Sequence, residues 1–314
     1  MADSPLPSQS MLSIAAVERN TGLGKDTLRV WERRYQFPQP GRDANGERVY
    51  PPDQVAKLRL IKRLIDRGYR PGKIIHFDLE ALHELNDGLL AADSKPVQAG
   101  DRADLLACLE LCKTHQVEAL RRNLSQALLR VGLQKFVVDV IAPLNHMVGE
   151  NWAKGVFAVY EEHLYTEAAQ NLLRNAISAI LQRQGDAEVR PVILLTTFPQ
   201  EQHGLGILMA EAIFALEGAR CISLGVQTPI ADIVRAAEAQ AVDIVALSFS
   251  SAINARQAVD GLAELSAALP PEIEVWVGGT SPALSHRGQK SARALSLSDV
   301  PAALEGWRQR LTTV

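Results

Sequence analysis

A loop histidine, His203, is the side chain in this sequence best placed to bind a metal ion. It follows the apolar run 192–195 and precedes an apolar-periodic helical pattern, 207–216. We therefore expect it at the carboxyl end of a strand in an α/β sheet, the edge where such sheets bind ligands. Glu201, two positions earlier, can accept the other ring N–H and raise the basicity of the metal-facing nitrogen. The plainer alternative is a loop histidine that this carboxylate simply satisfies.

Two later segments bring small and hydroxyl-bearing residues to the same predicted edge. Ser248 and Ser250 end a further predicted strand and supply hydroxyl groups. Glycines keep side chains away from places where a large planar ligand has to pass: Gly204, Gly206, Gly278 and Gly279. This pattern favours a ligand site over an ordinary loop.

A second set of residues lies in the middle of the chain. Trp152 is followed ten and eleven residues later by Glu162 and His163. Without other knowledge, Trp152 is a core aromatic residue and the Glu-His pair is the polar start of a helix. His146, six residues before Trp152, is most simply an ordinary residue of a helical bundle, and a ligand role is the less favoured alternative.

The N-terminal segment is basic and has the pattern helix, glycine-containing turn, helix. Ser13 is a suitable N-cap for the first helix, and the second helix, 24–35, carries four cations: Lys25, Arg29, Arg33 and Arg34. The following loop has a central Asn45-Gly46, a strong hairpin signal, between Arg42 and Arg48. A two-stranded wing of this kind can lie along a phosphate backbone.

Charge is distributed unevenly along the chain. Residues 1–75 contain 14 Lys+Arg and 8 Asp+Glu, a balance of +6. The remainder has 33 − 14 = 19 basic and 36 − 8 = 28 acidic residues, a balance of −9. A basic head on an acidic body predicts that a polyanion meets the head alone.

Composition excludes several classes of protein. The 314 residues are 47% hydrophobic and 22% charged, and neither a membrane-spanning run nor a secretory signal is recognisable, so we expect a cytoplasmic protein. Three cysteines, Cys108, Cys112 and Cys221, are too few for a disulfide framework. Cys108 and Cys112 have no second ligand pair, which favours ordinary thiols over a metal site. No Ser-His-Asp set, carboxylate pair or phosphate loop argues for an enzyme.

Hydrophobic periodicity divides the chain into domains. We predict a winged helix-turn-helix domain at 1–83, a linker at 84–101, a four-helix bundle at 102–185 and a flavodoxin-like (Rossmann-type) parallel α/β domain at 186–314. In the last domain, strands are expected at 191–197, 219–224, 242–249 and 273–277, with a weaker one near 294–297. Helices are expected at 204–217, 230–240, 254–268 and 299–312.

The head resembles the MerR family over roughly residues 11–76. Three motifs carry the resemblance: Thr27-Leu28-Arg29-x-Trp31-Glu32-Arg33-Arg34-Tyr35, Arg42-x-x-x-Gly46-x-Arg48-x-Tyr50 and Ile61-x-x-Leu64-x-x-x-Gly68. The resemblance implies that the second helix enters the major groove, with contacts from Lys25, Thr27 and Arg29. It implies contacts with the DNA backbone from Arg33, Arg42, Arg48 and Tyr50. Members of the family bind DNA as dimers, so a palindromic site in double-stranded promoter DNA is implied.

The C-terminal residues resemble the cobalamin-binding signature Asp-x-His-x-x-Gly, Ser-x-Leu, Gly-Gly. Glu201 stands where the signature has Asp, and Ser250 where it has Leu. The resemblance implies that His203 is the lower axial ligand of cobalt, supported by Glu201. It implies that the nucleotide tail of cobalamin lies beside Gly206, Ser248, Ser250, Gly278 and Gly279.

The set Trp-x9-Glu-His is similar to the cap of the light-responsive cobalamin regulators of the CarH/LitR kind. It implies that Trp152, Glu162 and His163 contact the 5′-deoxyadenosyl group of adenosylcobalamin. By this resemblance the protein is a repressor whose cofactor promotes a tetramer on DNA, and light disassembles that tetramer. Light-responsive members typically have His directly after the Trp, where this chain has Ala153.

Two alternatives remain at this stage. One is a regulator with the same body that binds no cobalamin or does not respond to light, which Ala153 and the altered signature favour. The other is a corrinoid methyltransferase module, against which the MerR-like head argues. The operator, the target genes and the upper axial ligand stay open, as does the choice between repressor and activator.

Overall fold

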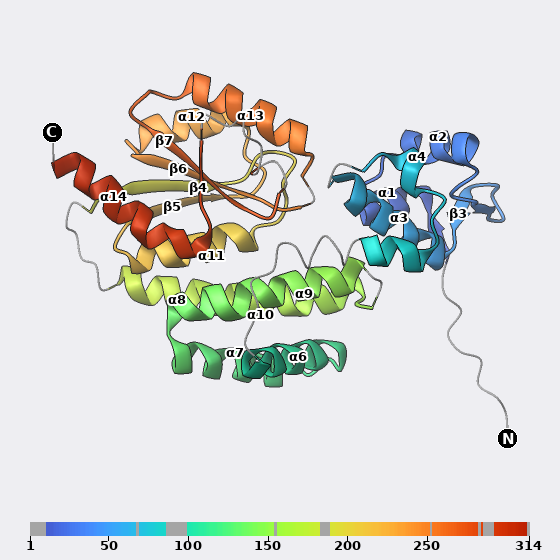
Figure 1. Cartoon of the computed structure of the whole chain (residues 1–314), viewed down its shortest axis with the longest axis horizontal. Coiled ribbons are helices and arrows are strands. Elements are labelled where there is room, and N and C mark those ends of the chain that lie inside the picture. The colour runs from blue at the N-terminus through green and yellow to red at the C-terminus, as the bar shows by residue number, and fades with distance from the viewer. Residues whose placement is uncertain are drawn as a thin grey trace. The chain divides into compact units, whose positions relative to one another are not determined.

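The computed structural model describes residues 11–66, 69–85, 99–153, 156–182, 189–251, 253–281, 284 and 292–312 (Figure 1). The chain divides into two compact units, one of residues 1–96 with 151–156 and one of residues 97–150 with 157–314. Most of the predicted linker, 86–98, lies outside the described residues, and its described ends, 84–85 and 99–101, are helical. In the described part of the chain, no helix has the length and apolar character needed to cross a membrane.

The first unit is a small helical domain with a three-stranded antiparallel sheet. Its helices are α1 (Ile14–Thr21), α2 (Lys25–Tyr35), α3 (Pro52–Asp66) and α4 (Pro71–Ile74), and its strands are β1 (Leu12–Ser13), β2 (Gly41–Arg42) and β3 (Arg48–Tyr50), in the order β1-β3-β2. The Ser13 hydroxyl caps α1 by accepting the Ala16 N–H at 3.3 Å. Gly22 ends α1 with a φ of +70°, which a side chain would disfavour. The sharp turn into α2 follows from that glycine.

The hairpin of the wing is longer than the Asn-Gly signal suggests. The loop between β2 and β3 runs from residue 43 to 47, and the Asp43 carboxylate accepts the N–H groups of Asn45 and Glu47, both at 2.9 Å. Gly46 takes the left-handed conformation, φ +78°. An aspartate turn and one glycine therefore close the wing, and β1, which the sequence analysis did not anticipate, extends its sheet.

The second unit begins with a helical bundle. It contains α6 (Ala99–Lys113), α7 (Val117–Val131), the consecutive segments α8 (Leu133–Lys135), η1 (Phe136–Ile141, a π-helix) and α9 (Ala142–Ala153), and finally α10 (Val159–Leu181). Large apolar residues such as Leu120, Phe136 and Tyr165 are at most 1% exposed and fill the bundle. The helix α10 packs against α11 (Leu205–Leu216), the helix that follows the His203 loop.

The α/β domain has a five-stranded parallel sheet in the order β5-β4-β6-β7-β8. Its strands are β4 (Val192–Thr196), β5 (Arg220–Gly225), β6 (Ile244–Phe249), β7 (Glu274–Gly279) and β8 (Arg293–Ala294). In chain order this is 2-1-3-4-5, the flavodoxin-like arrangement that the sequence predicts. The four main strands lie within two residues of the predicted bounds. The fifth is shorter and earlier, because Leu297–Asp299 forms a 3-10 turn instead.

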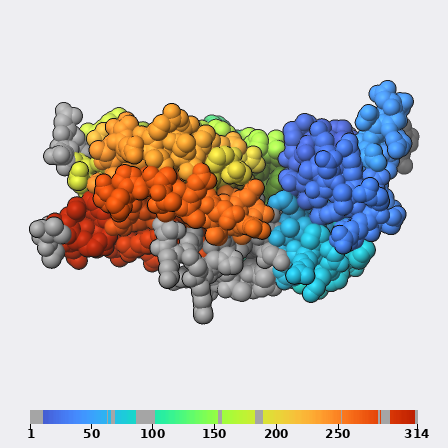
Figure 2. All heavy atoms as spheres, turned by 90° about the horizontal axis from the view of Figure 1, so that it is seen from above, coloured from blue at the N-terminus to red at the C-terminus, as the bar shows by residue number. Residues whose placement is uncertain are grey.

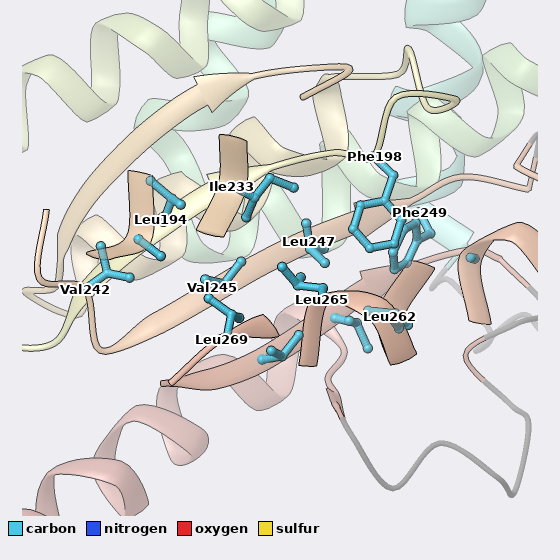
Figure 3. Packing of buried hydrophobic residues seen from close by; sticks show 14 of the residues in the cluster. Leu194, Phe198, Ile233, Val242, Val245, Leu247, Phe249, Leu262, Leu265 and Leu269 are labelled. Atoms are coloured by element: carbon cyan, nitrogen blue, oxygen red, sulfur yellow. The ribbon is translucent and has the colours of Figure 1, made fainter. Parts of the chain in front are cut away.

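Helices cover both faces of this sheet. One face carries α12 (Ile230–Ala239) and α13 (Ala255–Ala268), which lie side by side (Figure 2), and the other carries α11 and α14 (Val300–Thr312) (Figure 1). Alternate residues of β6, namely Val245, Leu247 and Phe249, point into the core beneath α12 and α13 together with Phe198 (Figure 3). The strand period of two therefore turns Ser248 to the α11 face.

Candidate functional site

The His203 loop lies at the switch point of the sheet. β4 and β6 are neighbouring parallel strands, and the chain leaves β4 toward α11 on one face and β6 toward α13 on the other. Such a point leaves a crevice beyond the carboxyl ends of the strands, where α/β domains bind ligands. The residues 197–204 follow β4 and Ser250 follows β6, so both segments that the sequence analysis singled out meet at this edge.

Glu201 holds these two segments together. Its side chain is 1% exposed, and Oε1 accepts the backbone N–H of His203 at 2.9 Å and lies 2.6 Å from His203 Nδ1. The other oxygen, Oε2, accepts the backbone N–H of Ser250 at 2.7 Å. Both oxygens have exchanged water for protein donors, which is what a buried carboxylate requires.

The electrostatics of the pair fix the protonation of the imidazole. Burial by itself raises the pKa of Glu201, but the hydrogen bonds and charge of His203 outweigh it and the pKa is lowered. The hydrogen bond with Glu201 in turn raises the pKa of His203, against burial and with a further contribution from the charge of Glu162. When the His203 ring is neutral, the anionic Glu201 stabilises the tautomer that carries its proton on Nδ1. The lone pair on Nε2 is then free to bind a metal ion.

His203 is therefore arranged as a metal ligand. Its side chain is 53% exposed, and among the described residues Nε2 makes no hydrogen bond with the protein. A histidine whose Nδ1 is held by a carboxylate while Nε2 faces outward has the geometry found in metal sites. The described residues contain no group of three or more His, Cys, Asp or Glu side chains placed to hold a metal ion.

Glycines allow close contacts within the protein at the sheet edge that carries this histidine. A Cβ on Gly206 would meet the Ser248 hydroxyl, and one on Gly279 would meet the backbone of Phe249. Gly279 also has a φ of +119°, a conformation nearly restricted to glycine. Gly278 approaches the Leu295 carbonyl, where a Cβ would lie 3.2 Å from the oxygen. These glycines allow neighbouring protein groups to approach closely, and the exposed side of His203 is the part of this edge that fits a large ligand.

Two apolar residues at the same edge were missed from the sequence. Leu224 and Val226 follow one another closely at the carboxyl end of β5, and each is 38% exposed. Val226 lies beside Gly204, where an added Cβ would come within 3.1 Å of its methyl group. Exposed apolar side chains next to a histidine with an exposed Nε2 suit the rim of a flat organic ligand. The only sign of these two residues in the sequence is a glycine, Gly225, between two apolar residues at the end of a predicted strand.

The helix α10 carries the Glu-His pair at its start. Glu162 is 31% exposed, with one oxygen 2.6 Å from Nδ1 of His163 and the other accepting the Thr166 hydroxyl at 2.6 Å. His163 is largely exposed. Glu162 and His203 are close enough for the charge of the first to raise the pKa of the second.

Trp152 has a different neighbour. It lies near the end of α9 in the first unit, with the Arg59 guanidinium 5.2 Å from its ring centre, a cation–π contact. The structure thus groups Glu162, His163, Glu201 and His203 in one unit and Trp152 in the other. His146, the alternative upper ligand, pairs with Glu150 one helical turn away, 2.9 Å between Nε2 and Oε1.

The second helix of the head, α2, presents cations on its exposed side. Lys25 pairs with Glu18 at 3.5 Å, and Arg29 with Asp26 at 3.0 Å. Thr27 is partly exposed and Arg33 is exposed. These exposed pairs contribute little to stability and exchange readily for other anions.

The wing holds its cations more firmly. Arg42 donates to the Gly46 carbonyl at 2.6 Å. Arg48 donates to both oxygens of Glu32 on α2, at 2.8 and 3.4 Å, which ties the wing to the second helix. Glu32 was not singled out from the sequence.

Tyr50 corrects the expectation of a contact with the DNA backbone. Its side chain is 0% exposed in the core of the head, and its hydroxyl has no hydrogen-bond partner among the described residues. The strand period of two puts Tyr50 on the same side of β3 as Arg48, the side that faces α2, and there the ring packs inward.

Comparisons with known proteins find family matches in the head, the helical bundle and the α/β domain. Residues 12–78 match the MerR HTH family regulatory protein model, and residues 105–176 and 191–295 match two models described as B12 binding domain. The chain is 32% identical to the HTH-type transcriptional repressor CarH of Myxococcus xanthus, over 85% of this chain and 87% of that protein. It is 27% identical to the HTH-type transcriptional repressor CarA of the same organism, over 85% of this chain and 86% of that one.

A solved structure supports the fold of the body. The monomethylamine corrinoid protein of Methanosarcina barkeri aligns with 63% of this chain and 96% of its own length, with a TM-score of 0.50 and 15% identity. At that identity the likeness concerns the fold alone. The match to CarH, by contrast, spans head and body together at 32% identity, and the chain therefore belongs to the CarH-type HTH transcriptional repressors, with a MerR-type head and cobalamin-binding domains.

Proposed function

We propose that this protein is a DNA-binding repressor that senses light through bound adenosylcobalamin. The observation that carries the proposal is His203, exposed at the switch point of the sheet with Nδ1 held by the buried Glu201. When bound, adenosylcobalamin supplies a Co–C bond that light breaks. The protein supplies the ligand, the enclosure and an assembly that depends on both.

Each proposed contact has a physical reason. Nε2 of His203 would hold the cobalt, and Glu201 would keep the proton on Nδ1. Gly206, Ser248, Ser250, Gly278 and Gly279 accept the nucleotide tail, since three of the five lack side chains and two offer hydroxyls. Trp152, Glu162 and His163 contact the adenosyl group, because a flat indole excludes water and a carboxylate accepts ribose hydroxyl protons.

The head binds a palindromic promoter site as part of a dimer. Lys25, Thr27 and Arg29 enter the major groove, and Arg33, Arg42 and Arg48 contact phosphates. Phosphate contacts give affinity with a steep salt dependence, whereas only the few groove residues select a sequence. In the dark, adenosylcobalamin assembles the chain to a tetramer that holds DNA.

Gel filtration of the loaded protein tests this function. Protein incubated with adenosylcobalamin in the dark is expected to elute as a tetramer and, after illumination, as a smaller species. The His203→Ala variant, treated identically, should elute at one position under both conditions. An unchanged elution of the wild-type protein on illumination would reject sensing by disassembly.

A second candidate function keeps the repressor and removes the light response. Ala153 stands where light-responsive relatives typically have His, so the upper face after loss of the adenosyl group has no imidazole at that position. The absorbance spectrum of protein passed through a desalting column after incubation with adenosylcobalamin separates the two. Corrin bands that stay with the protein in the dark but no change of elution on illumination favour this candidate.

A further inference from the structure

The Ser250 hydroxyl makes a contact with the metal-binding histidine that no sequence motif assigns. Its Oγ lies 3.1 Å from Nδ1 of His203, although the two residues are 47 positions apart. A hydrogen bond from the Ser250 side chain is also among the causes that lower the pKa of Glu201. A hydroxyl both donates and accepts, so Ser250 can donate to the Glu201 carboxylate and accept from Nδ1–H. The single Nδ1 proton is then shared between Glu201 at 2.6 Å and Ser250 at 3.1 Å.

The Ser250 hydroxyl, as a second acceptor for Nδ1–H, restrains the His203 ring in a way that Glu201 alone does not. Glu201 alone holds Nδ1 at one point and leaves the imidazole plane free to turn about that bond. An acceptor from another direction limits this rotation, and the direction of Nε2, on the opposite side of the ring, becomes fixed. The backbone N–H of Ser250 also binds Glu201, at 2.7 Å, so the carboxylate itself is held by the same residue.

We propose that Ser250 is a positioning residue that orients the His203 ring toward its metal, acting through Nδ1 and Glu201 in addition to its place beside the nucleotide tail. The inference rests on the proposed function for the identity of the metal. It is specific to this chain, since the signature has leucine at this position, and a leucine side chain can neither donate to Glu201 nor accept from the imidazole.

Three substitutions separate positioning from other roles. Ser250→Ala removes the hydroxyl but keeps the backbone N–H, and Ser250→Thr keeps both. Ser251→Ala is the matched control on the neighbouring residue, whose backbone N–H donates to Thr280 at 3.1 Å and is retained in the variant. All three are made in the full-length protein.

The first measurement is titration with adenosylcobalamin in the dark, followed by absorbance. We expect Ser250→Ala to bind about 3- to 10-fold more weakly, the effect of one lost hydrogen bond. We also expect a smaller fraction with the His-ligated spectrum at saturation. Ser250→Thr and Ser251→Ala should stay within about twofold of the wild type. Weaker binding of Ser250→Ala with an unchanged saturated spectrum would overturn the proposal, because the hydroxyl would then act through the nucleotide tail alone and not through His203.

The second measurement needs no cofactor. The Nδ1–H proton of His203, assigned by its loss in His203→Ala, is followed by NMR in the apo protein. Loss of one acceptor in Ser250→Ala should move this resonance upfield, while Ser251→Ala leaves it in place. Superimposable resonances in Ser250→Ala and the wild type would overturn the inference. If the wild type retained no cobalamin, the proposed function would fail, and this resonance would still decide the role of Ser250.

Discussion

At the scale of single residues, Gly206 is where stability and ligand binding are most directly opposed. Its missing side chain faces the Ser248 hydroxyl across the space between α11 and β6. Alanine is a better helix former than glycine by roughly 1 kcal/mol, yet crowding a packed site costs about 1–3 kcal/mol. Crowding therefore outweighs the gain in helix propensity by up to about 2 kcal/mol in the free energy of unfolding, and a ligand between helix and strand meets the crowding without that gain.

We therefore predict that Gly206→Ala folds but binds cobalamin at least about tenfold more weakly, since 1.4 kcal/mol corresponds to one factor of ten. Thermal unfolding and a cobalamin titration measure the two effects separately. The double variant Gly206→Ala, Ser248→Ala relieves the contact, and we expect it to regain stability without regaining affinity. Wild-type affinity in Gly206→Ala would show that the ligand does not pass this glycine.

The bundle cysteines allow a prediction from pKa. Burial, with the nearby charge of Asp104, raises the pKa of Cys108 to about 11, and burial with neighbouring Cys108 and Glu161 raises that of Cys112 to about 12. Alkylating reagents attack the thiolate, which at pH 8 is about 0.1% of Cys108 and less of Cys112. In native protein at pH 8 both should resist iodoacetamide, and unfolding in guanidinium should make both react. Rapid alkylation of either thiol in the native protein, located by mass spectrometry, would contradict the burial of this core.

At the scale of elements, the structure of the head places two residues with the same predicted role, contact with the DNA backbone, in different environments. Arg33 and Tyr50 both belong to the resemblance that implies contacts with the DNA backbone, but Arg33 is exposed on α2 and Tyr50 is buried on β3. Burial raises the pKa of Tyr50, so the hydroxyl stays protonated at neutral pH. Because that hydroxyl has no partner among the described residues, its removal should cost no folding stability.

We predict that Tyr50→Phe leaves DNA affinity unchanged and raises the free energy of unfolding by up to about 1 kcal/mol. Arg33→Ala should weaken DNA binding and reduce the slope of log K against log salt by about 0.9 for each head, or about 1.8 for a bound dimer, because each head loses one phosphate contact. Fluorescence anisotropy with labelled DNA at several salt concentrations measures both variants. A loss in Tyr50→Phe as large as that in Arg33→Ala would mean that the tyrosine leaves the core on DNA.

The same scale shows what sequence reasoning can reach. The central strands β4 and β6 were predictable because both of their faces are buried, which leaves continuous apolar runs such as 192–195. β1 was not predictable, since two residues carry no period and pair with β3 only in the folded chain. The same holds for the site. The pairing of Glu201 with His203 was predictable because the two residues are close in sequence. The contact of Ser250 with them was not, because it arises from the order of β4 and β6 in the sheet.

At the scale of the whole molecule, charge and assembly together determine DNA affinity. Residues 1–75 carry +6 and the remainder of the chain −9, so we expect the phosphate contacts to come from the heads. Each neutralised phosphate contributes about −0.9 to the slope of log K against log salt. The slope therefore measures how many heads are engaged at once. If adenosylcobalamin assembles dimers to tetramers as proposed, the dark complex engages twice as many heads as the illuminated one.

On a DNA probe with sites for all heads, we predict a salt slope in the dark about twice that after illumination. Apparent affinity should fall by about 10²- to 10⁴-fold on illumination, because linked sites raise the effective concentration of the second dimer. A probe that accommodates one dimer is the control and should give equal slopes in both states, since extra heads find no DNA there. Equal slopes in the dark and after illumination on the long probe, with a large change of affinity, would contradict this prediction. Light would then change the DNA affinity of each head rather than the number of heads bound.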